Sequence, residues 1–230
     1  MVVGKIQRVY KGKTTRVVRK KTPKRKIMMS QLPQAVRPEM KRVNLVIENE
    51  STYVLGNALG TIQLPFHMST GSGVAKRIGL KIQARGIHVK GHFFNRDGNP
   101  AYFVRMLVLQ DKSNNSQTFN GDEVLMKANV PVSHAQGTES AYLSINKNRY
   151  KVYSDKLIKL SSANTNAENL KIFNTFIKLN MPIKYDGEFG NDIATNNIQI
   201  VYWAVNPSNS VSTTEQIQAN YSTTAFYQDA

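Results

Sequence analysis

Basic side chains crowd the first 26 residues of the chain, where they could neutralise phosphate groups. Eleven Lys and Arg lie in this segment, and it contains no Asp or Glu. Ammonium and guanidinium groups bind phosphates through charge-assisted hydrogen bonds, and one tyrosine could stack on a base. The predicted nucleic-acid-binding residues are Lys5, Arg8, Tyr10, Lys11, Lys13, Arg16, Arg19, Lys20, Lys21, Lys24, Arg25 and Lys26.

Binding by these residues should depend on salt and hardly at all on sequence. Each neutralised phosphate of a single strand adds about 0.7 to the magnitude of the salt slope, so eleven contacts predict a slope of about −8. An anionic membrane is an alternative partner, but the segment has no amphipathic apolar face, so we expect no membrane insertion. The run "RKKTPKRK", residues 19–26, also has the form of a nuclear-localisation signal, which would make nuclear import factors partners.

The charge of the chain is concentrated at this end. Up to Arg42, fourteen Lys and Arg face a single acid, Glu39, so +13 of the net +16 lies in the first 42 residues. The same segment has few large apolar side chains and three prolines, so on its own it cannot bury enough surface to offset its ordering entropy. We therefore predict a disordered basic arm over residues 1–41 and one folded domain over residues 42–230.

Other residue types that could do chemistry do not form a predicted site. The chain has no cysteine, and on a strand His88 and His92 would stand about 13 Å apart, too far to share a metal ion. The two remaining histidines are His67 and His134. We predict ordinary structural or surface histidines, no cofactor and no enzymatic activity.

Two glycine-containing stretches loosely resemble ligand-binding loops. "TGSGVAK", residues 70–76, lacks the spacing of a phosphate-binding loop and is predicted to be a flexible loop. "DGEFGND", residues 186–192, brings Asp186, Glu188 and Asp192 together, and their oxygens could bind calcium. Its spacing matches no EF-hand, which favours a solvated turn.

The elements after the arm show the two-residue period of β-strands. Residues 176–185 are the clearest case: Ile177, Leu179, Met181, Ile183 and Tyr185 alternate with polar residues. The other predicted strands cover residues 43–48, 61–66, 80–94, 102–109, 149–160, 197–205 and 221–228. The phase slips at Gly86, where we predict a β-bulge, and a short helix is predicted at 121–127. Long polar loops between the strands favour an all-β antiparallel sandwich or jelly roll.

The order of these segments resembles a known family. "RIGLKIQARGIHVKG", "VRMLVLQDKS", "NRYKVYSDKLIKL", "FIKLNMPIKYDG", "NNIQIVYWAVNP" and "AFYQDA" follow the basic arm in turn. This order is similar to that of the capsid (coat) proteins of circular Rep-encoding single-stranded DNA viruses, the geminivirus-like and circovirus-like group.

The resemblance implies a single eight-stranded antiparallel jelly roll made of two four-stranded sheets, BIDG and CHEF. In chain order, it predicts B at 43–48, C at 80–94, D at 102–109, E within 124–146, F at 149–160, G at 176–185, H at 197–205 and I at 221–228. The six-residue link 95–100 is short for the proposed C and D. It further implies a homo-oligomeric icosahedral shell of about 60 copies that packages single-stranded DNA, located in the virion and in the host nucleus during assembly.

Three alternatives remain open. The chain could be the capsid protein of a small RNA virus, because phosphate contacts do not distinguish DNA from RNA. It could be a cellular, non-specific nucleic-acid-binding β-sandwich protein, although residues 43–230 carry a net charge of only +3. It could also be a carbohydrate-binding β-sandwich, but that needs an aromatic platform, and Trp203 beside Tyr202 is predicted to lie in the core.

Overall fold

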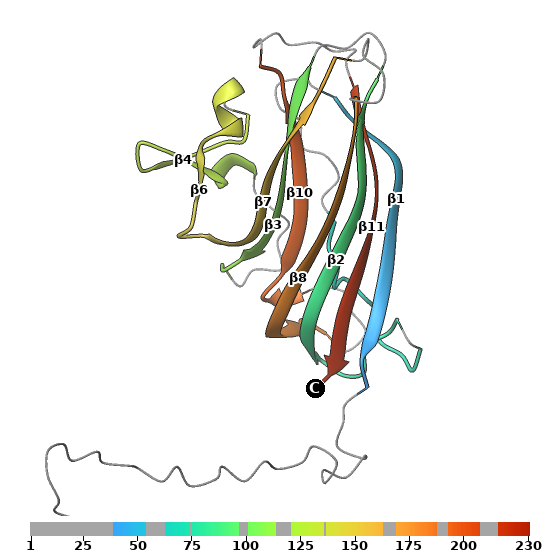
Figure 1. The fold of residues 1–230 in the computed structure, drawn as a ribbon. Coiled ribbons are helices and arrows are strands. Elements are labelled where there is room, and N and C mark those ends of the chain that lie inside the picture. Colours follow the sequence, from blue (N-terminus) through green and yellow to red (C-terminus); the bar gives the residue numbers. More distant parts are fainter. Residues whose placement is uncertain are drawn as a thin grey trace, which may run out of the picture. The chain divides into compact units, whose positions relative to one another are not determined.

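A computed structural model describes residues 39–53, 63–73, 75–96, 101–113, 121–135, 137–162, 169–187, 193–207 and 216–230 (Figure 1). The chain divides into two units, residues 1–37 and 38–230, and every described residue belongs to the second. The basic segment therefore lies outside the described residues, which all belong to the β domain.

Three antiparallel sheets make up the described part of the domain. The largest has the order β1 (Lys41–Tyr53), β11 (Gln216–Asp229), β2 (Lys81–Asn95), β8 (Leu170–Tyr185) and β9 (Ile193–Thr195). The second has the order β10 (Ile198–Val205), β3 (Tyr102–Asp111) and β7 (Tyr150–Leu160). A small third sheet has the order β5 (Val130–Val132), β4 (Leu125–Lys127) and β6 (Ser144–Ile145).

The two larger sheets have jelly-roll topology, but the predicted strand letters need correction. β1, β11, β2 and β8 take the BIDG positions, so residues 80–94 form D rather than C. β10, β3 and β7 take the H, E and F positions, so residues 102–109 form E rather than D. The C position, next to strand H, is occupied by Gln63. Its backbone forms two hydrogen bonds of 3.0 and 2.9 Å with Ile200 of β10. The predicted strand E region, 124–146, instead builds the small sheet.

The main core lies between the two larger sheets and follows the predicted alternation. On β8, Ile177, Leu179, Ile183 and Tyr185 are buried, and Met181 packs against them. Phe93 of β2 bridges the sheets, since its ring centroid lies 5.0 Å from that of Phe173 and 5.2 Å from that of Tyr202. Shared burial of such side chains holds the two sheets together.

A second apolar cluster covers the opposite side of the β10–β3 pair. Trp203, Leu107 and Leu109 pack there against the small sheet and the 3-10 turn η4 (Gly137–Ala141). Every residue of β10 is consequently buried. Trp203 is a core residue, as predicted, and its Nε1 donates to Ser140 Oγ at 3.3 Å.

The predicted helix at 121–127 is wrong. A single 3-10 turn, η3 (Gly121–Glu123), is followed directly by β4. Ala128 and Asn129 have φ values of 50° and 66° and close a two-residue hairpin to β5, a turn that fits the twist of paired strands and stops a helix. No helix within the described ranges is long and apolar enough to cross a membrane.

The predicted bulge on β2 is confirmed. Pairing with both neighbouring strands shifts between Ala84 and Gly86, which leaves Arg85 as the extra residue opposite β11. The bulge restores alternation, so that Ile87 and Val89 continue the buried row that begins at Ile82.

Gly91 should be intolerant of a side chain. A Cβ at this position would lie 2.2 Å from the Asn220 carbonyl oxygen and 2.4 Å from the Tyr221 Cβ. Gly91→Ala should therefore lower the free energy of unfolding by about 3 kcal/mol, since backbone would have to move. Urea denaturation tests this, with Gly73→Ala as the matched control, because a Cβ there makes only ordinary contacts with Lys76. Equal stability of the two variants would contradict the close approach.

Candidate functional site

The twelve predicted phosphate-binding and stacking residues, at positions 5–26, all lie outside the described residues. Their assignment stays a prediction. Of the three acids in the predicted solvated turn at 186–192, Glu188 and Asp192 also lie outside, and Asp186 is described. Within the described ranges, no three His, Asp or Glu form a group that could hold a metal ion.

The beginning of β1 is held by an ion pair and hydrogen bonds. Lys41, the first residue of β1, forms an ion pair of 2.6 Å with Asp229 at the end of β11. Its Nζ also donates to the Lys76 carbonyl at 3.3 Å, and Asp229 Oδ1 accepts from the Ile78 backbone N–H at 2.9 Å. The first strand, the last strand and the 76–78 segment are thus held together at this end of the sheet.

Buried Arg77 fixes the neighbouring loop. Its guanidinium lies 3.9 Å from the ring centroid of Tyr185 and donates to the Gly187 carbonyl at 2.8 Å. Burial raises the pKa of the Tyr185 hydroxyl, an effect that the charge of Arg77 partly opposes. The Gly71 N–H donates to the Arg77 carbonyl at 3.0 Å, which joins these two positions. The side chain of Lys76 occupies the space beside Gly71.

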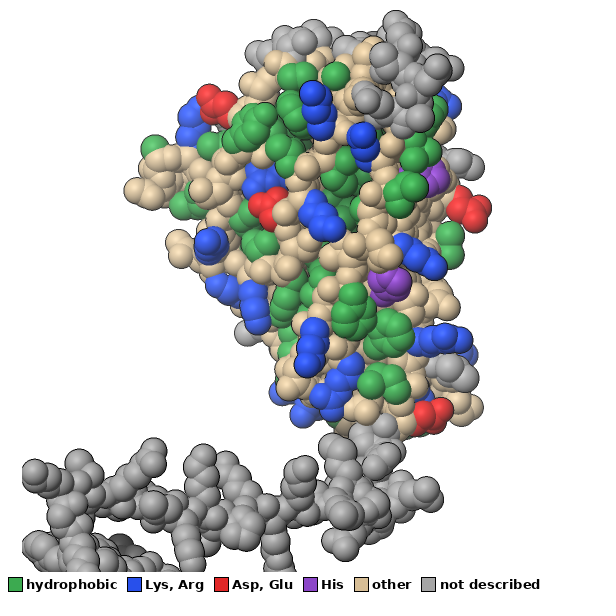
Figure 2. Space-filling model, viewed as in Figure 1, with side chains coloured by type: hydrophobic (Ala, Val, Ile, Leu, Met, Phe, Trp, Pro, Cys, Tyr) green, Lys and Arg blue, Asp and Glu red, His purple; other side chains and the backbone are tan. Residues whose placement is uncertain are grey.

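The side of the five-stranded sheet that faces away from the core, here called the outer face, is basic (Figure 2). Glu48 is the only acid among its described side chains. Lys81 and Lys184 stand directly opposite each other on paired strands, with no acid between them. Within the described part of the chain, none of the six cations of this face forms an ion pair with a carboxylate: Arg42, Lys81, Arg85, Lys90, Lys178 and Lys184.

Aromatic rings lie among these cations. The Phe176 side chain is 62% exposed, and its ring centroid lies 6.2 Å from that of Phe226 and 6.4 Å from that of His88. We call these three residues the aromatic platform. A hydrogen bond of 2.6 Å joins His88 Nε2 to Asn174 Oδ1 and fixes the imidazole ring. A Cβ on Gly86 would lie 2.9 Å from Phe176 Cζ, so the ring rests against the bare backbone of the bulge.

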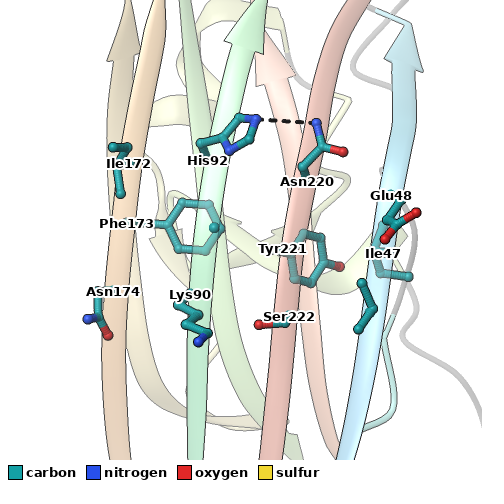
Figure 3. A pocket seen from close by; sticks show the side chains of 12 residues that line it. Ile47, Glu48, Lys90, His92, Ile172, Phe173, Asn174, Asn220, Tyr221 and Ser222 are labelled. Carbon is teal, nitrogen blue, oxygen red and sulfur yellow. Dashed lines mark hydrogen bonds between the residues drawn. The ribbon is translucent and has the colours of Figure 1, made fainter.

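An open groove of about 760 Å³ lies beside the platform and crosses β1, β11, β2 and β8 (Figure 3). Exposed Val46 and Ile172 line it on the two outer strands, and Lys90 lies between them. A hydrogen bond of 3.3 Å joins the Asn220 side chain to His92 Nε2. His88 and His92 are therefore both hydrogen-bonded to asparagines.

The outer face was not predicted as a site from the sequence. Lys178 and Lys184 occupy the polar phase of the most regular predicted strand, so an outward orientation was evident for them. That they share one face with Lys90 and Arg42 follows only from the pairing of four strands. Listing every outward position of the BIDG strands together would have found the face.

Chemically, the outer face combines fixed cations with an exposed ring. Arg85 lies across the sheet, with Nε donating to Gln228 Oε1 at 2.7 Å and Nη1 donating to Asn180 Oδ1 at 2.6 Å. Such positioned guanidinium groups bind oxyanions, and exposed phenyl rings stack on planar groups.

No protein-family model matches the chain, and no curated protein matches it. Among solved structures, it is similar to a chain of desmodium yellow mottle tymovirus, at 13% identity and TM-score 0.36 over 85% of this chain and 91% of that one. A chain of mud crab tombus-like virus matches at 14% identity and TM-score 0.35, covering 95% and 94%. Dimeric latent PorU from Porphyromonas gingivalis matches at 5% identity and TM-score 0.35, covering 83% of this chain and 13% of that one. These scores assign neither a family nor a function.

Proposed function

We propose that the chain is a viral capsid protein that assembles into a small icosahedral shell and packages single-stranded DNA through its basic arm. The arm is residues 1–41 and the jelly-roll capsid domain is residues 42–230. The observation that carries the proposal is the joining of a jelly-roll domain to an arm that holds +12 of the +16 net charge. A closed shell uses one modest domain many times and places many arms around one polyanion.

Exposed apolar side chains away from the outer face support assembly. Val130 and Tyr142, in and beside the small sheet, are both largely exposed, as is Leu80 next to β2. Large apolar side chains of this kind are common where protein surfaces meet. We propose that copies of the chain contact one another there, which leaves the basic outer face for another partner.

The proposed location is the virion, with the host nucleus as the site of assembly. Residues 19–26 would then bind host nuclear import factors before assembly, since the run has the form of a localisation signal. DNA is favoured over RNA by the sequence resemblance alone. The capsid protein of a small RNA virus is therefore the second candidate.

The nucleic acid that co-sediments with the protein provides the test of packaging. The full chain is produced in cells, treated with nucleases and fractionated by sedimentation, and nucleic acid is then extracted from fast-sedimenting fractions. We expect protected single-stranded nucleic acid to co-sediment with the protein, and its sensitivity to DNase or RNase after extraction separates the two candidates. Absence of protected nucleic acid would overturn the packaging role.

A further inference from the structure

We propose that the outer face of the five-stranded sheet is a second binding site for single-stranded nucleic acid, in which Phe176 stacks on a base and the surrounding Lys and Arg bind phosphates. The ligand class rests on the proposed function, but the site uses none of the arm residues. The arm neutralises charge, whereas this face would hold individual nucleotides against the domain.

The setting of Phe176 suits stacking. A phenyl ring 62% exposed on a regular strand gives up burial that it would have in the core. The ring is supported by Gly86 beneath it and by Phe226 beside it, so it is held in place while most of its surface stays accessible. Base–aromatic stacking contributes about 1–3 kcal/mol per base and tolerates any base.

Cations lie on several sides of the ring. Lys178 follows Phe176 by two residues, about 6.7 Å along the same face of β8. Lys90 is a diagonal neighbour, because His88 pairs with Phe176 and Lys90 pairs with Asn174. On the other side, Arg42 pairs with Phe226. A strand of nucleic acid crossing the platform would meet a cation on each side of the stacked base.

Charge decides which occupant this face favours. A second copy docking through the same face would bring two sets of six cations together, which is repulsive. Three described acids elsewhere are already ion-paired within the chain: Glu123, Glu139 and Asp155, to the partners Arg149, Lys127 and Arg105. A single-stranded polyanion satisfies the cations and the exposed ring together.

Photocrosslinking of the full chain tests the site directly. An oligothymidylate carrying one 5-iododeoxyuridine, whose photoproducts form with stacked aromatic side chains, is irradiated with the protein, and the modified peptides are identified by mass spectrometry. We expect crosslinks on the peptide that contains Phe176. Crosslinks confined to the peptide that contains Tyr10 would overturn the inference while supporting the arm.

Affinity measurements provide the second readout. Phe176→Ala should raise the Kd for oligothymidylate by about 5- to 150-fold with an unchanged salt slope, because it removes stacking without removing charge. Phe176→Trp should restore the affinity. Leu157→Ala, at an exposed apolar residue of β7 in the other large sheet, is the control and should change the affinity less than twofold. Joint Lys90→Gln and Lys178→Gln should reduce the magnitude of the slope by about 1.4.

Each outcome separates this inference from the proposed function. Wild-type affinity in a folded Phe176→Ala variant, with particles and protected nucleic acid still present, would overturn the second site and leave the capsid proposal standing. Altered particle assembly with unchanged oligothymidylate affinity would make the platform a contact between copies and likewise overturn the inference. Loss of affinity in Phe176→Ala without any particle formation by the wild type would support the site and contradict the shell.

Discussion

Replacing the six basic residues between positions 19 and 26 with glutamine should reduce the magnitude of the salt slope for single-stranded DNA by about 4. The altered residues are Arg19, Lys20, Lys21, Lys24, Arg25 and Lys26. Each neutralised phosphate releases condensed counterions, so removing six cations removes six such contributions. Fluorescence anisotropy with an oligothymidylate between 50 and 400 mM salt, roughly the range where such slopes are resolved, measures the effect.

A charge-preserving variant controls for this experiment. Exchanging Lys for Arg and Arg for Lys at the same six positions keeps the charge and should keep the slope. Retention of the wild-type slope by the glutamine variant would show that these residues do not contact phosphate. The remaining cations of the arm, or the domain, would then carry the nucleic-acid binding.

Arg105→Met should destabilise the folded domain by about 3 kcal/mol. Arg105 is 5% exposed and forms two hydrogen bonds with Asp155, from Nε at 3.0 Å and from Nη2 at 2.7 Å. Its Nη1 donates to the carbonyls of Ser140 and Leu143 at 2.9 and 2.7 Å, which ties the small sheet region to β3. Methionine fills a similar volume but leaves these acceptors without their donor.

The exposed pair Lys127–Glu139 supplies the matched control. Both side chains are about half exposed, at 50% and 53%, so Lys127→Met should cost less than about 1 kcal/mol. Urea denaturation of both variants gives the comparison. A loss in Arg105→Met no larger than that in Lys127→Met would show that the buried network does not stabilise the fold.

Local sequence patterns predicted most of the strands, because the alternation of a strand depends on residues that are neighbours in sequence. The alternation of β8 and the bulge at Gly86 are properties of one strand, and both are confirmed. Arg105 stands in a largely apolar stretch of β3, and the structure explains it through partners more than 30 residues away.

The strand letters failed because the predicted strand at 61–66 was given no letter and residues 80–94 were assigned as C. Within the described residues, Gln63 of that stretch forms the bridge to β10 at the C position. The six-residue link that seemed too short for C and D in fact joins D and E, which lie in different sheets. The helix predicted at 121–127 failed because a hairpin follows the 3-10 turn at 121–123. Its turn residues, Ala128 and Asn129, adopt positive φ, and no glycine in the sequence indicates this turn.

The net charge of the folded domain does not indicate its basic outer face. Residues 42–230 carry only +4, yet the outward positions of four strands collect six cations and one described acid on one surface. A small net charge therefore does not distinguish a shell protein from a cellular nucleic-acid-binding protein. Assembly does distinguish the two classes, because only copies of a shell protein need to form a closed particle.

The size of the particle formed by the purified full-length chain tests the central claim most directly. Mass photometry and cryo-electron microscopy are applied across a range of salt and pH, with and without single-stranded DNA. We predict closed particles of one size, about 60 copies in the simplest case and about 1.6 MDa of protein from chains of 25.9 kDa. Monomers or dimers under every condition would contradict the capsid assignment.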